Sequence, residues 1–176
     1  MHKVILVDDE ENVLKALKRA LATEPYDIEI YTNGVDVLER AKTTAVDLVL
    51  SDYRMPAMDG VALLTELKKL QPDTMRLIIS GYTDLEALLA AINQAEIYRF
   101  ISKPWKDYEL KATLSQALVH RAVLLENKRL ADQVRAQQTQ LVEQHKILEK
   151  LETESPGITR VRWAEDGSII LGEDDI

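Results

Sequence analysis

The sequence predicts an α/β fold: a five-stranded parallel sheet wound with helices on both faces, followed by a long C-terminal helix. Short apolar runs alternate with stretches of helical periodicity five times before about residue 122, as in doubly wound domains. The apolar runs are nearly continuous, which is typical of strands buried on both faces of a parallel sheet. Polar residues directly follow four of these runs, at the sheet edge where ligands bind in such folds.

Two strands and two helices are predicted before the middle strand. Lys3 to Asp8 form the first strand, because four consecutive apolar residues occupy it. From Asn12 to about Ala22, apolar residues recur every three or four positions, which indicates a helix. Ile28 to Tyr31 alternate apolar and polar side chains, as in a strand near the edge of a sheet. A turn then leads into a short helix from Val35 to Ala41.

The remaining elements of the domain alternate in the same way. A buried apolar run ends at Asp52, and a loop that contains Pro56 follows at once. Gln71-Pro72-Asp73 ends the next helix, and Thr83 or Asp84 supplies an N-cap for the one after it. The elements are a strand at 48–52, a helix at 61–70, a strand at 75–80, a helix at 85–95 and a strand at 98–102.

A long helix is predicted from Asp107 to about Thr153, a stretch without Gly or Pro. At about 1.5 Å per residue it would run roughly 70 Å, so only its first part can cover the sheet. Apolar residues continue at a 3-4 spacing with glutamines in the gaps, which favours a coiled coil with polar core positions and a homodimer through residues 110–152. The alternative, a solvated single helix, is hard to sustain for a mostly polar sequence. The spaced residues are Leu130, Val134, Gln137, Leu141, Gln144, Leu148 and Leu151.

The last segment differs in composition from the rest. Ser155-Pro156-Gly157 ends the helix, and the β-rich stretches around Asp166-Gly167 predict a hairpin in an acidic tail. The predicted organisation is therefore an α/β domain at 1–122, a long helix continuing from it at 107–153, and the tail at 154–176.

Composition excludes several classes of function. The 176 residues are 46% hydrophobic and 30% charged, as in ordinary globular proteins. The chain has no cysteine, and its three histidines are scattered, which excludes thiol chemistry and paired-histidine metal sites. The net charge of −8 argues against broad electrostatic binding to nucleic acid. Because no apolar run is long enough to span a membrane and no signal-peptide pattern opens the chain, we expect a cytoplasmic protein without a membrane partner.

Acidic, hydroxyl and lysine side chains are expected to meet at one edge of the sheet, because they follow parallel strands. They are Asp8, Asp9, Asp52, Ser80 and Lys103. Clustered carboxylates need a cation or raised pKa values, and oxygen ligands suit Mg²⁺. A lysine and a hydroxyl suit phosphate, and a carboxylate can form an acyl phosphate. Each residue alone would be uninformative, but together they predict an aspartyl-phosphate site with Asp52 as the acceptor.

Residues 1 to about 122 resemble the receiver domain of two-component response regulators. The resemblance is carried by Asp8-Asp9, Asp52 with Met55-Pro56 and Asp59-Gly60, Ser80-Gly81, and Lys103-Pro104. It implies a flavodoxin-like sheet of order 2-1-3-4-5 in a bacterial cytoplasmic protein. It also implies that Asp52 takes a phosphoryl group from a histidine kinase or a phosphotransfer protein. The chain would then be a phosphoacceptor and not an enzyme, apart from self-phosphorylation by small phosphodonors and autodephosphorylation.

The resemblance also implies a role for individual residues. Mg²⁺ would be held by the side chains of Asp9 and Asp52 and by the backbone carbonyl of Arg54, with Asp8 acting through water. Ser80 and Lys103 would contact the phosphoryl oxygens. Phe100 occupies the aromatic switch position, where the ring turns inward when Ser80 moves toward the phosphate. Arg54 and Tyr82 would tune the lifetime of the phosphate, and their size favours a long-lived phospho form.

The output of the predicted receiver is open to several interpretations. Residues 81–105 resemble receivers attached to HD-type cyclic-dinucleotide phosphodiesterases and relatives with σ54-type outputs, but three scattered histidines cannot build a His-rich phosphodiesterase site. No helix-turn-helix follows the receiver, so dimerisation through the coiled coil and hairpin is the first hypothesis, with an unknown protein partner. The chain could instead regulate an enzyme in trans, or lack an output domain beyond Ile176. A constitutive scaffold is disfavoured, because every chemical position is filled.

Overall fold

The structure, a computed structural model, describes residues 1–81 and 95–156. These residues belong to two compact units, Met1–Glu126 and Asn127–Ile176, which are considered separately. The predicted helix at 85–95, apart from Ala95, and the predicted hairpin of the acidic tail lie outside the described residues. So does Tyr82.

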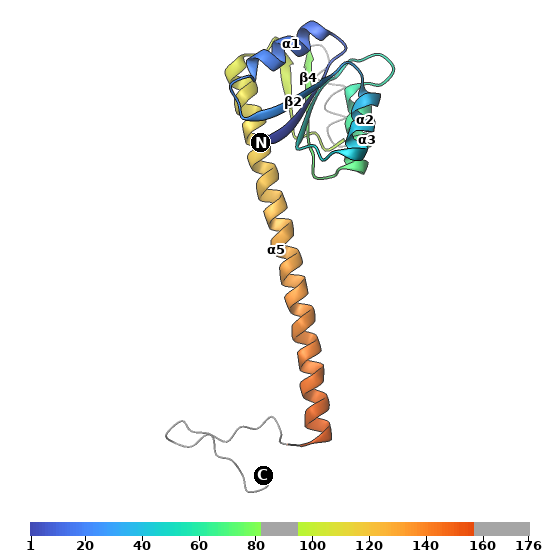
Figure 1. The fold of residues 1–176 in the computed structure, drawn as a ribbon, viewed down its shortest axis with the longest axis vertical. Coiled ribbons are helices and arrows are strands. Elements are labelled where there is room, and N and C mark those ends of the chain that lie inside the picture. The colour runs from blue at the N-terminus through green and yellow to red at the C-terminus, as the bar shows by residue number, and fades with distance from the viewer. Residues whose placement is uncertain (82–94, 157–176) are drawn as a thin grey trace. The chain divides into compact units, whose positions relative to one another are not determined.

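The first unit contains the predicted five-stranded parallel sheet, in the order β2-β1-β3-β4-β5 (Figure 1). The α/β fold class and the 2-1-3-4-5 order are therefore confirmed. The strands are β1 (His2–Val7), β2 (Tyr26–Tyr31), β3 (Leu48–Asp52), β4 (Met75–Gly81) and β5 (Arg99–Lys103). All five residues of β3 are buried, which explains its continuous apolar run.

Helices cover both faces of the sheet and enclose two apolar clusters. On one face, strand residues such as Leu6 and Leu50 pack with α1 (Glu11–Ala20) and the beginning of α5 (Asp107–Glu154). On the other face, Ile5 and Val49 pack with α2 (Gly34–Thr43) and α3 (Gly60–Leu70). Alternate residues of each strand thus enter opposite clusters, which is how a doubly wound sheet is buried.

Two helix starts are set by capping side chains. Asn33 accepts a hydrogen bond from the Asp36 N–H at 2.9 Å, so α2 begins at Gly34. Asp59 accepts from the Ala62 N–H at 2.8 Å, so α3 begins at Gly60. Both helices begin one residue before the predicted positions, which were Val35 and residue 61. In each helix the glycine that directly follows the cap is already the first helical residue.

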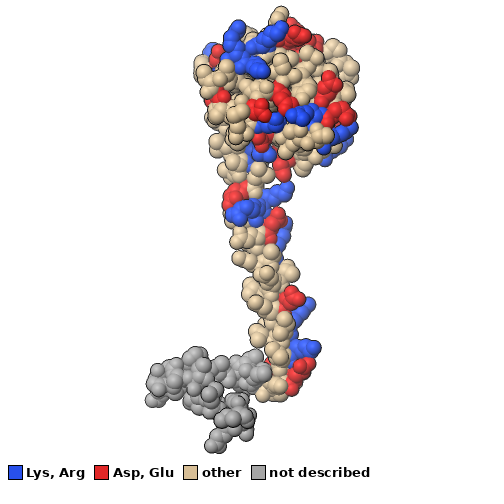
Figure 2. Space-filling model, in the orientation of Figure 1, with Lys and Arg blue, Asp and Glu red and all other residues tan. Residues whose placement is uncertain are grey.

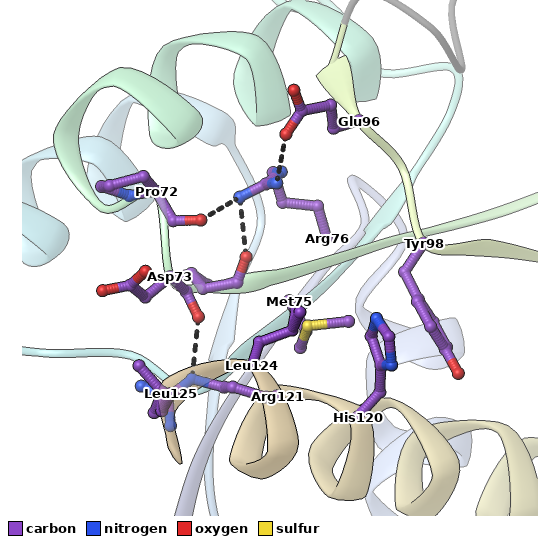
Figure 3. A pocket seen from close by; sticks show the side chains of 11 residues that line it. Pro72, Asp73, Met75, Arg76, Glu96, Tyr98, His120, Arg121, Leu124 and Leu125 are labelled. Carbon is purple, nitrogen blue, oxygen red and sulfur yellow. Dashed lines mark hydrogen bonds and ion pairs between the residues drawn. The ribbon is translucent and has the colours of Figure 1, made fainter. Parts of the chain in front are cut away.

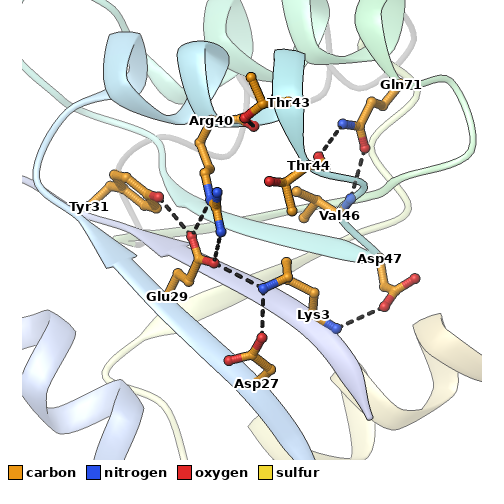
Figure 4. A network of polar contacts seen from close by, with 10 residues as sticks. All are labelled: Lys3, Asp27, Glu29, Tyr31, Arg40, Thr43, Thr44, Val46, Asp47 and Gln71. Carbon is orange, nitrogen blue, oxygen red and sulfur yellow. Dashed lines mark hydrogen bonds and ion pairs between the residues drawn. The ribbon is translucent and has the colours of Figure 1, made fainter.

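A polar network fastens the edge strand β2 to β1 and α2 (Figure 4). The carboxylate of Glu29 accepts hydrogen bonds from the Arg40 guanidinium at 2.9 and 2.7 Å and from Lys3 Nζ at 3.0 Å. The hydroxyl of Tyr31 donates to the same carboxylate at 2.7 Å. These contacts lower the pKa of Glu29 to about 2, and the hydrogen bonds from Arg40 have the largest effect. The partial burial of Glu29 acts in the opposite direction.

Gln71 and Asp47 order the opposite end of the sheet, where the strands begin (Figure 4). The amide of Gln71 donates to the carbonyls of Ala41 and Thr44 at 2.6 and 2.7 Å and accepts from the Val46 N–H at 2.9 Å. These bonds satisfy carbonyls at the C-terminal end of α2.

The first turns of α5 belong to the core of the first unit. Leu110, Leu114, Ala117 and Leu118 are buried. Arg121 then binds the carbonyl of Asp73 at 2.8 Å and the carboxylate of Asp47 at 2.7 Å. The predicted long helix is confirmed as one continuous helix over Asp107–Glu154. Among the described residues, no helix is both long and apolar enough to cross a membrane.

A cavity of about 220 Å³ lies beside Arg121, between the start of β4 and α5 (Figure 3). On one side, the buried guanidinium of Arg76 donates to the carbonyls of Ala95, Pro72 and Thr74 at 2.9, 3.1 and 2.7 Å. On the other side, the ring of Tyr98 stacks on His120 with 5.2 Å between ring centroids. The backbone carbonyls around Arg76 satisfy a buried charge that would otherwise be costly.

We expect Glu29→Gln to lower the free energy of unfolding at pH 7 by about 1 kcal/mol, because a partly exposed ion-pair network is screened by solvent. The folded-state pKa of Glu29, about 2, lies below its ordinary value of 4.5. The stability contributed by the charge is therefore present above pH 4.5 and lost as the pH falls toward 2. Urea unfolding at a series of pH values measures this.

Glu39→Gln is the matched control, because among the described residues Glu39 pairs only with the exposed Lys42 three residues on in the same helix. The control should change stability by a few tenths of a kcal/mol. A Glu29→Gln deficit that is the same at pH 3 and pH 7 would show that the network's charges do not stabilise β2.

Candidate functional site

The sheet brings four of the predicted side chains to the edge where the strands end. Asp8 directly follows β1, Asp52 and Lys103 are the last residues of β3 and β5, and Ser80 is the next-to-last residue of β4. In the register of the sheet, Asp52 pairs with Ile79, and Gly81 pairs with Lys103. The strand ends are thus level with one another, as expected for a ligand site in a parallel sheet.

The ammonium group of Lys103 binds two carboxylates at once. Lys103 Nζ lies 2.6 Å from Asp52 Oδ1 and 2.7 Å from Asp8 Oδ2. The remaining carboxylate oxygens accept backbone hydrogen bonds, Asp52 Oδ2 from the Arg54 N–H and Asp8 Oδ1 from the Glu10 N–H, both at 2.9 Å. Both acids are buried, so these partners replace the water that each carboxylate gives up on folding.

The cluster holds more negative than positive charge. Burial raises the pKa of the Asp52 carboxyl above its usual range, against the opposing effect of Lys103, and the charge of Asp8 adds to the increase. Burial alone would lower the pKa of Lys103, but its hydrogen bonds to Asp52 and Asp8 outweigh burial and leave that pKa raised. Two carboxylates facing one ammonium leave an excess negative charge that a further cation would neutralise.

The other predicted residues lie in different settings. Ser80 is buried, and its hydroxyl lies 3.4 Å from the carbonyl of Gly81, a long hydrogen bond. Asp9 and Arg54 are exposed. Phe100 is also exposed, at 38%. Of the adjacent pair Asp8-Asp9, it is Asp8 that enters the buried cluster.

Gly60 contributes to the site through its lack of a side chain, a steric reason that the sequence does not show. A Cβ atom on Gly60 would lie 2.1 Å from the carbonyl oxygen of Asp52 and 3.0 Å from Ser51 Oγ. The Gly60 N–H donates to the Tyr53 carbonyl at 2.9 Å, and Ser51 Oγ donates to the Asp52 carbonyl at 2.9 Å. The start of α3 therefore lies directly against the backbone of the acceptor residue.

The donors present fit a hard divalent cation. Among the described residues, no three His, Cys, Asp or Glu side chains gather closely enough to hold a metal ion by themselves. Lys103 Nζ nevertheless shows that one cation can contact both Asp8 and Asp52, because it does so at 2.7 and 2.6 Å. Two carboxylates supplemented by a backbone carbonyl and water make an oxygen-only ligand set of the kind that Mg²⁺ prefers.

Comparison with known proteins agrees with this geometry. Residues 4–115 match the response regulator receiver domain family. The chain belongs to this family. It is 36% identical over 115 residues to the hydrogenase transcriptional regulatory protein HoxA of Bradyrhizobium diazoefficiens, which covers 65% of this chain and 24% of the relative. It is 35% identical over 117 residues to the DNA-binding transcriptional regulator NtrC of Escherichia coli K12, which covers 66% of this chain and 25% of the relative.

Solved structures show the same receiver fold. The signal receiver domain of an HD domain-containing protein from Pseudomonas fluorescens Pf-5 is 38% identical, with a TM-score of 0.68 over 71% of this chain and 92% of that one. A protein from Neptuniibacter caesariensis is 40% identical, with a TM-score of 0.68 over 72% of this chain and 93% of that one. The chain spans about a quarter of the length of the curated relatives it matches.

Gly60→Ala should destabilise the receiver by about 1–3 kcal/mol, because the added methyl group can fit only if α3 moves away from the Asp52 backbone. Chemical denaturation measures the change. Gly81→Ala is the matched control, since a Cβ atom at Gly81 meets no atom of the described residues within 4 Å, and it should change stability by less than about 0.5 kcal/mol. Equal effects of the two substitutions would contradict the close approach at Gly60.

Asp52→Asn should stabilise the metal-free receiver. Because the folded-state pKa of Asp52 lies above its ordinary value of 3.8, its contribution to stability is favourable at low pH and is lost as the pH rises through that folded-state pKa. The substitution removes this loss and leaves Asp8 paired with Lys103. We expect the free energy of unfolding at pH 7, measured with urea and a metal chelator, to rise on the order of 1 kcal/mol.

Asp9→Asn serves as the control for net charge, since it removes one negative charge from an exposed neighbour. It should have a much smaller effect. The difference between Asp52→Asn and the wild type should close as the pH falls and Asp52 becomes protonated. An Asp52→Asn variant less stable than the wild type at pH 7 would contradict this account.

Proposed function

We propose that this chain is a two-component response regulator in which Asp52 accepts a phosphoryl group from a histidine kinase or a phosphotransfer protein. One observation supports the proposal above others: Lys103 Nζ binds the buried carboxylates of Asp8 and Asp52 at the end of the sheet. A structural ion pair needs only one acid. A second buried acid at the same ammonium is a destabilising arrangement that suits a site for phosphate and a metal ion.

In the transfer step, a carboxylate oxygen of Asp52 forms a bond to the phosphorus of the donor. The bond from phosphorus to the donor's imidazole nitrogen breaks, its electron pair stays on that nitrogen, and the imidazole then takes up a proton. The Arg54 N–H holds Asp52 Oδ2 at 2.9 Å and so orients the carboxylate for attack. Lys103 then binds a phosphoryl oxygen in place of the Asp52 oxygen it holds now, and Ser80 donates a hydrogen bond to another.

The residues placed to hold Mg²⁺ are Asp9 and Asp52 through their carboxylates, Arg54 through its backbone carbonyl, and Asp8 through water. When bound, Mg²⁺ would neutralise the excess negative charge of the acid cluster and of the incoming phosphoryl oxygens. In this scheme the chain acts as a phosphoacceptor that self-phosphorylates from small donors and loses the phosphate by hydrolysis. A cytoplasmic location fits such partners.

Two further residue sets are proposed to convert the modification into a signal. Phe100, whose ring is now exposed at 38%, would turn inward once Ser80 moves toward the phosphate. Arg54 and Tyr82 would shield the acyl phosphate from water and prolong its lifetime. The output would be read by protein contacts of α5 and the acidic tail, with an unidentified protein partner and without nucleic acid.

A small phosphodonor with Mg²⁺ should convert the wild-type chain to an acyl phosphate, seen as a shifted band on a phosphate-affinity gel. Asp52→Asn should give no shifted band, because an amide oxygen does not attack phosphorus as a carboxylate does. Asp107→Asn, an exposed acid in the first turn of α5, is the control and should shift like the wild type. A hydroxylamine-sensitive band of undiminished strength in Asp52→Asn would refute the assignment of the acceptor.

A further inference from the structure

Residues 127–151, in the helix of the second unit, separate charge by heptad position. In a heptad written abcdefg with Val134, Leu141 and Leu148 at a, every Lys, Arg, Asp and Glu between 127 and 151 falls at b, c or f. Positions a, d, e and g of this segment, called the coil segment below, carry none. The charged residues are Lys128, Arg129, Asp132, Arg135, Glu143, Lys146, Glu149 and Lys150.

The charged side has contacts within its own helix. Arg135, at b, binds Asp132, at f, at 3.1 Å. Two further pairs start from this side: Lys150 at c binds Glu154, which lies beyond 151, at 3.7 Å, and Glu149 at b lies 3.3 Å from His145 at e. Such pairs three and four residues apart keep a solvated helix face ordered without any partner.

Among the residues that the structure describes, none covers the uncharged side. Its apolar residues are exposed, including Leu141 at 63% and Leu148 at 51%. Figure 2 shows charged side chains along one edge of the lower helix, with a strip of uncharged surface beside them. A helix that exposes leucines to this extent along an uncharged side gains stability by burying them, because apolar surface is removed from water.

We propose that a second copy of this chain covers the uncharged side, and that the two coil segments form a parallel, in-register coiled coil. The inference rests on the proposed function, in which α5 makes the output contacts, and adds the partner and its orientation. The segment is long enough, at roughly 37 Å and more than three heptads. Within the coil segment, two identical helices also meet without charge repulsion, because none of its e and g positions carries Lys, Arg, Asp or Glu.

The polar residues of the seam decide the orientation. In a parallel, in-register pair each layer is made of the same residue twice, so Gln137 meets Gln137, Gln144 meets Gln144, and every leucine meets a leucine. In an antiparallel pair with full overlap, a positions face d positions, so Gln137 would lie opposite Leu141 and Gln144 opposite Val134. Those amides would then be buried against hydrocarbon without a hydrogen-bonding partner, which is unfavourable.

The absence of cysteine from the sequence allows a direct test with the full chain. Leu130→Cys places one thiol at a d position. In the proposed pair the two thiols meet across the seam within disulfide reach, so mild oxidation should convert most of the variant to a covalent dimer on a non-reducing gel. Lys128→Cys, at a b position on the charged side, is the matched control and should cross-link at least tenfold less.

A mixture of Leu130→Cys with Leu148→Cys tests the other orientation, because an antiparallel pair brings these two positions together. Cross-links that form only between the two different variants would overturn the parallel arrangement. A monomeric mass by light scattering at micromolar concentration would overturn the coiled coil.

Phosphodonor labelling of the same Leu130→Cys sample separates this proposal from the proposed function. A cross-linked chain that cannot be labelled would count against Asp52 as acceptor and leave the coiled coil intact.

Discussion

The contact of one lysine with two buried carboxylates is the constraint on which the functional end of this receiver depends. Lys103 comes from β5, Asp52 from β3, and Asp8 from the end of β1. Burial raises the pKa of Asp52 despite the lysine beside it, and the negative charge of Asp8 adds to the increase. A fold that retains such an arrangement gives up stability at that point, and a phosphoryl group with its metal ion would restore the balance of charge.

The rest of the domain holds these strand ends level. The parallel register places Gly81 beside Lys103 and Ile79 beside Asp52, and helices on both faces bury the strands so that they cannot slip. Gly60 lets α3 begin against the Asp52 backbone. At the other end of the sheet, Arg121 ties the carboxylate of Asp47 and the carbonyl of Asp73 to α5, so the first turns of that helix are part of the same framework.

Periodicity and strand-end chemistry were enough to predict the sheet and the meeting of Asp8, Asp52, Ser80 and Lys103, because parallel strands bring their carboxyl ends to one edge. The sequence could not show that Asp8 is buried and Asp9 exposed, because neighbouring residues at a strand end can turn either way. Contacts between distant residues, such as Arg121 with Asp47, follow from packing and leave no local pattern. The separation of charge over 127–151 is visible in the sequence, but Leu114 and Leu118, which are buried in the first unit, do not continue its heptad register.

The central claim is that Asp8 and Asp52 form one cation-dependent acceptor site. Carboxyl-carbon NMR during a Mg²⁺ titration of the full chain tests it most directly, because each acid is observed separately. We expect the Asp8 and Asp52 signals to move along one common saturation curve, while the signal of the network carboxylate Glu29 stays in place. Signals of Asp8 and Asp52 that remain at their metal-free positions at saturating Mg²⁺ would contradict it.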